Sequence, residues 1–134
     1  MTIPAHITLT IVQDDELENR EFVFDEPTEC IIGRAADCDI QIPTDNVHVD
    51  VSRHHCVLEI HPPHIQVRDL GSLNGTFVND RKIGQRPPNQ PSEESGLWPS
   101  AAHALKTGDE LCVGHVVFRV QITVGAPAEQ GSYY

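Results

Sequence analysis

The sequence predicts an all-β fold, an antiparallel β-sandwich. Of its 134 residues, 32 are isoleucine, valine or threonine, whose β-branched side chains suit strands better than helices. Short apolar runs recur every 8 to 15 residues with turn residues between them, as in sandwiches and barrels, and no segment has the pattern of a long helix. The length predicts one domain that buries roughly two-thirds of its unfolded surface without help from disulfides or metals.

Ten segments combine apolar or β-branched residues with turn residues at their ends. We predict strands, in chain order, at residues 7–12, 20–24, 29–33, 39–42, 55–60, 64–69, 76–78, 81–83, 110–113 and 116–124. In the last segment the even positions from Val116 to Val124 are all apolar, which predicts one buried face. Gly114 and His115 separate the last two segments and fit a two-residue type II′ turn, so these two strands should pair.

Residues 85–104 interrupt this rhythm, because they contain four prolines, two adjacent acids and few aliphatic residues. We expect a long surface loop here, held down by Trp98. The acidic run at residues 14–18 is expected to be a solvated hairpin turn. We assign residues 1–124 to the domain and residues 125–134 to a flexible C-terminal tail.

The charge distribution excludes several classes of partner. The formal net charge is −11, which repels nucleic acid and anionic membranes, so neither is an expected partner. The chain has no apolar run near 18 residues and no basic flank of a signal peptide, so we expect a cytoplasmic protein. Only residues 51–90, with 5 basic and 3 acidic side chains, would favour an anion, which close contacts would have to capture.

The cysteines and histidines do not predict a metal or catalytic site. Cys30, Cys38, Cys56 and Cys112 show no CxxC pairing, so we expect buried thiols and no cofactor. A run of potential ligands contains His48, His54, His55, Cys56, His61 and His64. Neighbouring residues of a strand point to opposite faces, so this run is not expected to bind one ion. No G-x-S-x-G motif is present, and we expect no enzyme activity.

Three predicted loops contain polar residues that a sandwich core does not need. They are Gly33-Arg34, the segment from Ser52 to His55, and the segment from Gly71 to Thr76. Alternate connections of an antiparallel sandwich lie at one end, so the three loops can present two arginines, a serine and an asparagine to one ligand. Arginine forks and hydroxyls are the donors that a phosphate monoester needs.

These loops carry a resemblance to the forkhead-associated (FHA) domains. The matching stretches, in order and with similar spacing, are GR at 33–34, SRHH at 52–55, DLGSLNGTFVN at 69–79 and LKTGDEL at 105–111. The resemblance covers about residues 7–124 and implies a sandwich of about eleven strands with the ligand loops at one end. It also implies a module that binds phosphothreonine peptides.

The resemblance also implies a role for individual residues. The Ser52 hydroxyl would donate to the phosphate, and Arg34 and Arg53 would contact it as cations. Asn74 would bind the main chain of the peptide. The architectural residues would be Gly33, His55, Gly75, Thr76 and Asn79, with His55 holding the Ser52 loop.

Two positions depart from the pattern of the family. Leu73 stands where many members have serine or threonine, so only its main-chain N–H could contact the phosphate. Asp80 stands where glycine is common after Asn79, and aspartate tolerates the left-handed conformation that this turn needs.

The predicted function is a phosphothreonine-dependent interaction in Ser/Thr kinase signalling. The expected partner contains phosphothreonine and is a Ser/Thr kinase or its substrate. The alternative is a scaffold that binds without phosphate, through a sheet face or the loop at residues 85–104.

Overall fold

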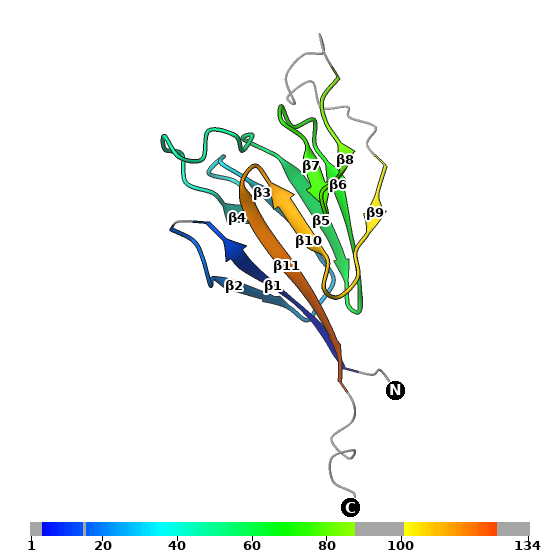
Figure 1. Ribbon diagram of the computed structural model, residues 1–134. Coiled ribbons are helices and arrows are strands. Elements are labelled where there is room, and N and C mark those ends of the chain that lie inside the picture. The colour runs from blue at the N-terminus through cyan, green and yellow to red at the C-terminus, as the bar shows by residue number, and fades with distance from the viewer. Residues whose placement is uncertain (1–3, 15, 88–100, 126–134) are drawn as a thin grey trace, which may run out of the picture.

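The computed structural model describes residues 4–14, 16–87 and 101–125 (Figure 1). Within these ranges the chain forms eleven strands. They are β1 (Ala5–Gln13), β2 (Glu21–Phe24), β3 (Thr28–Gly33), β4 (Ile40–Gln41), β5 (Cys56–His61), β6 (His64–Asp69), β7 (Thr76–Val78), β8 (Arg81–Gly84), β9 (His103–Ala104), β10 (Glu110–Val113) and β11 (Val116–Val124). No helix in the described ranges is long and apolar enough to cross a membrane.

The strands form two sheets. The six-stranded sheet has the order β2-β1-β11-β10-β7-β8, and the five-stranded sheet has the order β4-β3-β5-β6-β9. The paired strands are antiparallel except β3 and β4, which run parallel. The all-β sandwich predicted from the sequence is therefore confirmed, with one parallel pair at the edge of the second sheet.

One hydrophobic core joins both sheets. Phe118 in β11 lies opposite Ile11 of β1 and Leu111 of β10 and is fully buried. The predicted alternation in β11 holds over most of the strand, with two exceptions. Val117 is also buried, and Val124, the last residue of the strand, is 53% exposed.

Two local predictions are revised by long-range contacts. Part of the expected loop forms strand β9, which pairs with Gln66 and Val67 and so covers the edge of β6. The acidic run is not fully solvated, because Asp14 is only 4% exposed and accepts hydrogen bonds from the main-chain N–H groups of Glu16 and Leu17. Trp98 and the tail from residue 126 lie outside the described residues.

Two tight turns have the geometry that their sequences predict. Gly114 has a φ of +62° while His115 is not in the left-handed region, as a type II′ turn requires. Asn79 and Asp80 have φ values of +51° and +68°, the pattern of a type I′ turn. The β10–β11 hairpin and the β7–β8 hairpin are therefore closed by turns that match the twist of their strands.

The cysteines are free thiols, as expected. Cys30, Cys38 and Cys56 are buried, and Cys112 is half-buried. Burial raises the pKa of the Cys30 thiol to about 12. Burial also raises the pKa of the Cys56 and Cys112 thiols, so these three thiols stay protonated and act as small apolar side chains.

Candidate functional site

Three loops meet at the end of the sandwich opposite the chain termini (Figure 1). They are the β3–β4, β4–β5 and β6–β7 connections, which carry Arg34, Ser52 and Asn74. The main-chain N–H of Arg34 donates to the Ser52 carbonyl at 3.1 Å, and Asn74 Nδ2 donates to the carbonyl of Asp50 at 3.2 Å. The structure therefore brings together the loops whose residues the sequence singled out.

The Arg34 guanidinium is positioned by the neighbouring loop. Its Nε donates to the main-chain carbonyl of Val51, which fixes the direction of the side chain. Among the described residues, no carboxylate forms an ion pair with it. The cation is half-buried, so its charge is available for an anion that approaches the end of the sandwich.

The Ser52 hydroxyl lies at the junction of two loops. Its oxygen accepts a hydrogen bond from the main-chain N–H of Leu73 at 2.9 Å. Within the described ranges its own proton has no acceptor. A hydroxyl held in this way can donate to an added oxyanion without giving up the bond that positions it.

His55 holds the Ser52 loop in place. The buried ring accepts the Ser52 N–H at Nδ1, at 3.0 Å, and its Nε2 lies 2.8 Å from the Gly75 carbonyl. These two partners require a neutral ring with the proton on Nε2. One ring therefore joins the Ser52 loop to the β6–β7 loop.

Gly33 allows a close approach of two main chains. A Cβ at this position would lie 2.1 Å from the Arg53 carbonyl oxygen, far inside contact distance. That oxygen accepts the Ala35 N–H at 3.0 Å and the Cys38 thiol at 3.2 Å. The exposed Arg53 side chain therefore projects from a well-anchored main chain at the same end of the molecule.

Asp69 organises the β6–β7 loop, a role that the sequence reasoning did not assign. Its fully buried carboxylate accepts the N–H groups of Gly71 and Ser72 through Oδ2, and the hydroxyls of Ser72 and Thr76 through Oδ1. In an Asx turn the side chain of an aspartate accepts the main-chain N–H groups two and three residues further along the chain. The D-L-G-S stretch at residues 69–72 is compatible with such a turn, so the sequence contained a signal for this role.

The other architectural residues have local functions. Gly75 has a φ of +97°, a conformation that residues with a side chain rarely adopt. Asn79 Nδ2 donates to Asp109 at 2.9 Å, and its Oδ1 accepts the Glu110 N–H at 2.9 Å. Asn79 therefore ties the β7–β8 turn to the start of β10, away from the ligand loops.

Leu73 presents its side chain to solvent. The side chain is 58% exposed, and the N–H expected to face the phosphate is the group that donates to Ser52. The Asn74 side chain is also exposed, with its amide donor directed to Asp50. The hydrogen bonds to Ser52 and Asp50 therefore hold the tip of the β6–β7 loop in place, and its outer surface remains accessible to solvent.

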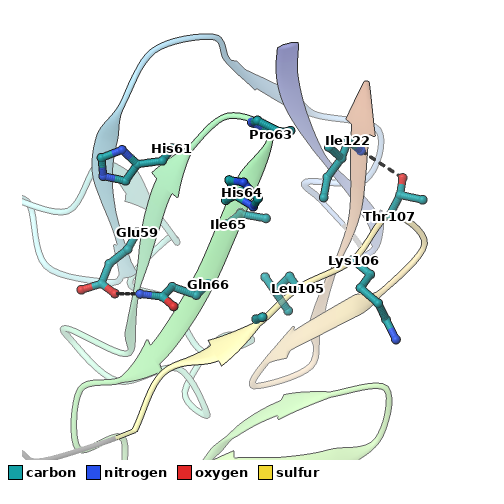
Figure 2. A pocket seen from close by; sticks show the side chains of 11 residues that line it. Glu59, His61, Pro63, His64, Ile65, Gln66, Leu105, Lys106, Thr107 and Ile122 are labelled. Carbon is teal, nitrogen blue, oxygen red and sulfur yellow. Dashed lines mark hydrogen bonds between the residues drawn. The ribbon is translucent and has the colours of Figure 1, made fainter. Parts of the chain in front are cut away.

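A pocket elsewhere lacks the chemistry of an anion site. It lies at the opposite end of β5 and β6 from the three loops and is lined by Glu59, His61, Gln66, Leu105, Lys106 and Ile122, among others (Figure 2). Gln66 donates to Glu59 at 2.6 Å, and Lys106 points outward from the pocket (Figure 2). No arginine is among its lining residues, whereas the three loops carry Arg34 and Arg53.

The predicted histidine run is dispersed in the structure. His61 and His64 lie opposite each other in the β5–β6 hairpin, and both nitrogens of His55 are occupied as described above. His54 Nε2 lies 2.8 Å from Asp37, and this contact lowers the pKa of the Asp37 carboxyl. A different set of residues, with His48 and His115, forms a cluster that the sequence reasoning did not foresee.

Comparison with known proteins identifies the family. The family model of the FHA domain matches residues 30–93, which contain all three ligand loops. The oxoglutarate dehydrogenase inhibitor of Corynebacterium glutamicum is 32% identical over 127 residues, which cover 95% of this chain and 71% of that protein. The chain belongs to the FHA domain family.

Other FHA proteins are similar over most of the chain. The glycogen accumulation regulator GarA of Mycolicibacterium smegmatis is 29% identical over 95% of this chain and 65% of its own length. A solved structure from a study of phosphothreonine-dependent FHA domain interactions has a TM-score of 0.63 at 25% identity, covering 87% of this chain and 95% of that one. Mycobacterium tuberculosis EmbR in complex with a low-affinity phosphopeptide matches with a TM-score of 0.63 and 25% identity, over 90% of this chain and 25% of its own.

Proposed function

We propose that this FHA domain binds phosphothreonine peptides and so mediates phosphorylation-dependent protein–protein interaction in Ser/Thr kinase signalling. The observation that carries the proposal is the junction of Arg34 and Ser52. The main-chain N–H of Arg34 donates to the Ser52 carbonyl, and the side-chain Nε of Arg34 donates to the Val51 carbonyl in the same loop. This junction places a guanidinium without a described ion pair beside a hydroxyl whose proton has no described acceptor. A phosphate dianion supplies the acceptor oxygens and the charge that both groups lack.

Each residue has a distinct role in the proposed complex. Ser52 donates its hydroxyl proton to the phosphate, and Arg34 and Arg53 supply the positive charge. Asn74 binds the main chain of the peptide, and the main-chain N–H of Leu73 positions the Ser52 hydroxyl. With a net charge of −11, the domain binds its anion through these short, directed contacts and not through long-range attraction.

The domain acts without catalysis in this proposal. Its relatives are named as an inhibitor and a regulator, which supports a role in binding. The partner is a phosphothreonine-containing protein of the cytoplasm, either a Ser/Thr kinase or a substrate of one. Phosphorylation of that partner turns binding on, because the domain binds only the phosphorylated form.

Calorimetric titration with matched peptides tests the proposal. An oriented library first selects a phosphothreonine sequence, which is then compared with its unphosphorylated, phosphoserine and glutamate forms. We expect the tightest binding for the phosphothreonine peptide, with a micromolar Kd, about −8 kcal/mol. Phosphoserine should bind more weakly by about 1 kcal/mol, because it lacks one methyl group. Equal binding of the glutamate or unphosphorylated peptide would favour the phosphate-independent scaffold.

Two substitutions locate the binding site. Ser52→Ala and Arg34→Ala should each weaken phosphopeptide binding by more than about 2 kcal/mol, roughly 30-fold, because a charged acceptor loses its donor. Arg119→Ala is the control for charge, because Arg119 is exposed on β11 and pairs with Glu110. An equal loss in all three variants would show that only net charge matters and would exclude the proposed pocket.

A further inference from the structure

Two histidine rings and one carboxylate converge beside the ligand loops. His48 Nε2 lies 2.8 Å from Asp14 Oδ1, and His115 Nε2 lies 3.0 Å from the same oxygen. The two rings stack with their centres 5.0 Å apart. One potential ligand atom from each of the three residues lies within 4.8 Å of the other two. The cluster joins the turn after β1, the β4–β5 loop and the β10–β11 hairpin.

The opposite nitrogen of each ring contacts a second carboxylate. His48 Nδ1 lies 2.9 Å from Asp45 Oδ1, and His115 Nδ1 lies 3.1 Å from Asp50 Oδ1. Histidines that ligate metals almost always donate the other ring N–H to a carboxylate or carbonyl, which orients the ring and raises its basicity. Both rings here have that arrangement, and their Nε2 atoms converge on Asp14 Oδ1, where an ion would replace the ring protons.

Asp14 is oriented in the same way. Its Oδ2 accepts the main-chain N–H groups of Glu16 and Leu17, both at 3.0 Å, so Oδ1 faces the two rings. His48 is fully buried, Asp14 is 4% exposed, and His115 is half-buried. The three ligand atoms therefore face a partly enclosed position with one side toward solvent.

The charge of the cluster calls for a cation. Asp14, Asp45 and Asp50 surround only two imidazoles, so neutral rings would leave three negative charges in a partly buried region. Such a concentration of charge needs a cation close by. Two ring protons supply two positive charges, and one divalent ion in place of them supplies the same number.

We propose that Asp14, His48 and His115 form a binding site for a divalent transition metal, with Zn²⁺ the preferred ion. Two imidazole nitrogens and one carboxylate oxygen are a known three-residue ligand set for zinc, with solvent in the fourth position. Ligand bonds of about 2.0–2.1 Å in tetrahedral geometry separate the ligand atoms by roughly 3.3 Å. The two contacts to Asp14, at 2.8 and 3.0 Å, therefore need to open by a few tenths of an ångström. The two ring nitrogens, which lie within 4.8 Å of each other, need to adopt the same spacing of about 3.3 Å.

Metal titration of the chelator-treated full chain tests this site. Calorimetry with Zn²⁺ should give one ion per chain, and the melting temperature should rise because the ion joins three separate segments. Co²⁺ should give the strong visible absorption of a four-coordinate ion. It should give no sulfur-to-metal band in the near ultraviolet, because the site contains no thiolate. X-ray absorption of the zinc form should show nitrogen and oxygen neighbours at about 2.0–2.1 Å.

Three variants assign the ligands. His115→Gln should lower the affinity for Zn²⁺ at least 100-fold, and Asp50→Asn, which keeps the main-chain bond to Asn74, should lower it about 10- to 100-fold. His61→Gln is the control, because His61 is exposed at the far end of β5. Circular dichroism checks folding, and the absorption spectra of the wild type test the site even if His115→Gln does not fold.

Other results would overturn the proposal. The absence of one-to-one binding, or equal affinity in the wild type and His115→Gln, would show that the cluster is held by protons alone. A thiolate band, or loss of binding in His54→Gln, would place the ion at the group formed by Asp37, Cys38 and His54 instead.

Discussion

The Ser52 hydroxyl accepts the main-chain N–H of Leu73 at 2.9 Å, across 21 residues of sequence. This bond joins the β4–β5 loop to the β6–β7 loop at the point where the phosphate is proposed to bind. It uses a lone pair of the oxygen and leaves the hydroxyl proton to donate. The two loops are therefore positioned before a ligand arrives, which lowers the ordering cost of binding.

Any side chain at position 33 should destabilise the domain, because the main chain of Arg53 lies against Gly33. Gly33→Ala places a Cβ against the Arg53 carbonyl, so the free energy of unfolding should fall by about 2–3 kcal/mol, and phosphopeptide binding should weaken as the Arg53 segment moves. Gly108→Ala is the matched control, since its φ is also positive, at +92°, but no atom lies within 4 Å. Unfolding in urea and peptide titration measure both effects. Unchanged peptide affinity in folded Gly33→Ala would contradict this prediction.

Replacing the buried carboxylate of Asp69 should strongly lower the free energy of unfolding. In Asp69→Asn one oxygen becomes an NH₂ group that faces donors, so at least one pair of hydrogen bonds is lost. We expect the free energy of unfolding to drop by at least about 3 kcal/mol. Asp39→Asn, at an exposed residue with one side-chain bond to the Ile31 N–H, should cost less than about 1 kcal/mol. Similar urea midpoints for the two variants would show that Asp69 does not organise the loop.

The β7–β8 turn offers a stabilising substitution. Asp80 has a φ of +68°, so Asp80→Gly relieves left-handed strain that outweighs the greater flexibility of glycine in the unfolded chain. The free energy of unfolding should rise by about 0.5 kcal/mol, whereas Asp80→Ala should lower it. Chemical unfolding of both variants measures the difference, and a lower stability for the glycine variant than for the alanine variant would argue against turn strain.

Asp109 should make stability depend on pH in the acid range. Burial alone would raise the pKa of its carboxyl, but hydrogen bonds from the Lys106 N–H and the Asn79 amide outweigh burial and hold it below 3.8. A carboxyl with a lowered pKa in the folded state stabilises the protein above its unfolded pKa, near 4. That contribution is lost as the pH falls through the lower folded value.

A comparison of two variants isolates this contribution. The stability gap between the wild type and Asp109→Asn should be full above about pH 5 and should narrow as the pH falls below about 4, through the lowered pKa of the folded state. Glu26→Gln, at an exposed residue, should follow the wild type throughout. Unfolding in urea, measured from neutral to acid pH, provides the comparison. A stability gap that does not change with pH would show that protonation of Asp109 is not coupled to folding.

The sequence by itself determined the strands other than β9 and the two hairpin turns at Asn79-Asp80 and Gly114-His115. Alternation of apolar residues located β11, and Gly114-His115 specified its type II′ turn, because both depend on local geometry. The four motif stretches likewise predict which loops bind the ligand, because the donors and acceptors of a loop are set by its own residues.

Only the tertiary structure decided which polar groups meet. Asp14 was expected in solvent, yet it is buried against His48, which lies 34 residues away. Strand β9, with two residues, is too short for any periodic signal, and it forms because the edge of β6 needs a partner. The local pattern of apolar and polar residues sets which secondary structure each segment prefers. Contacts between segments distant in sequence decide which groups pair with buried charges and with strand edges, and no local pattern encodes those contacts.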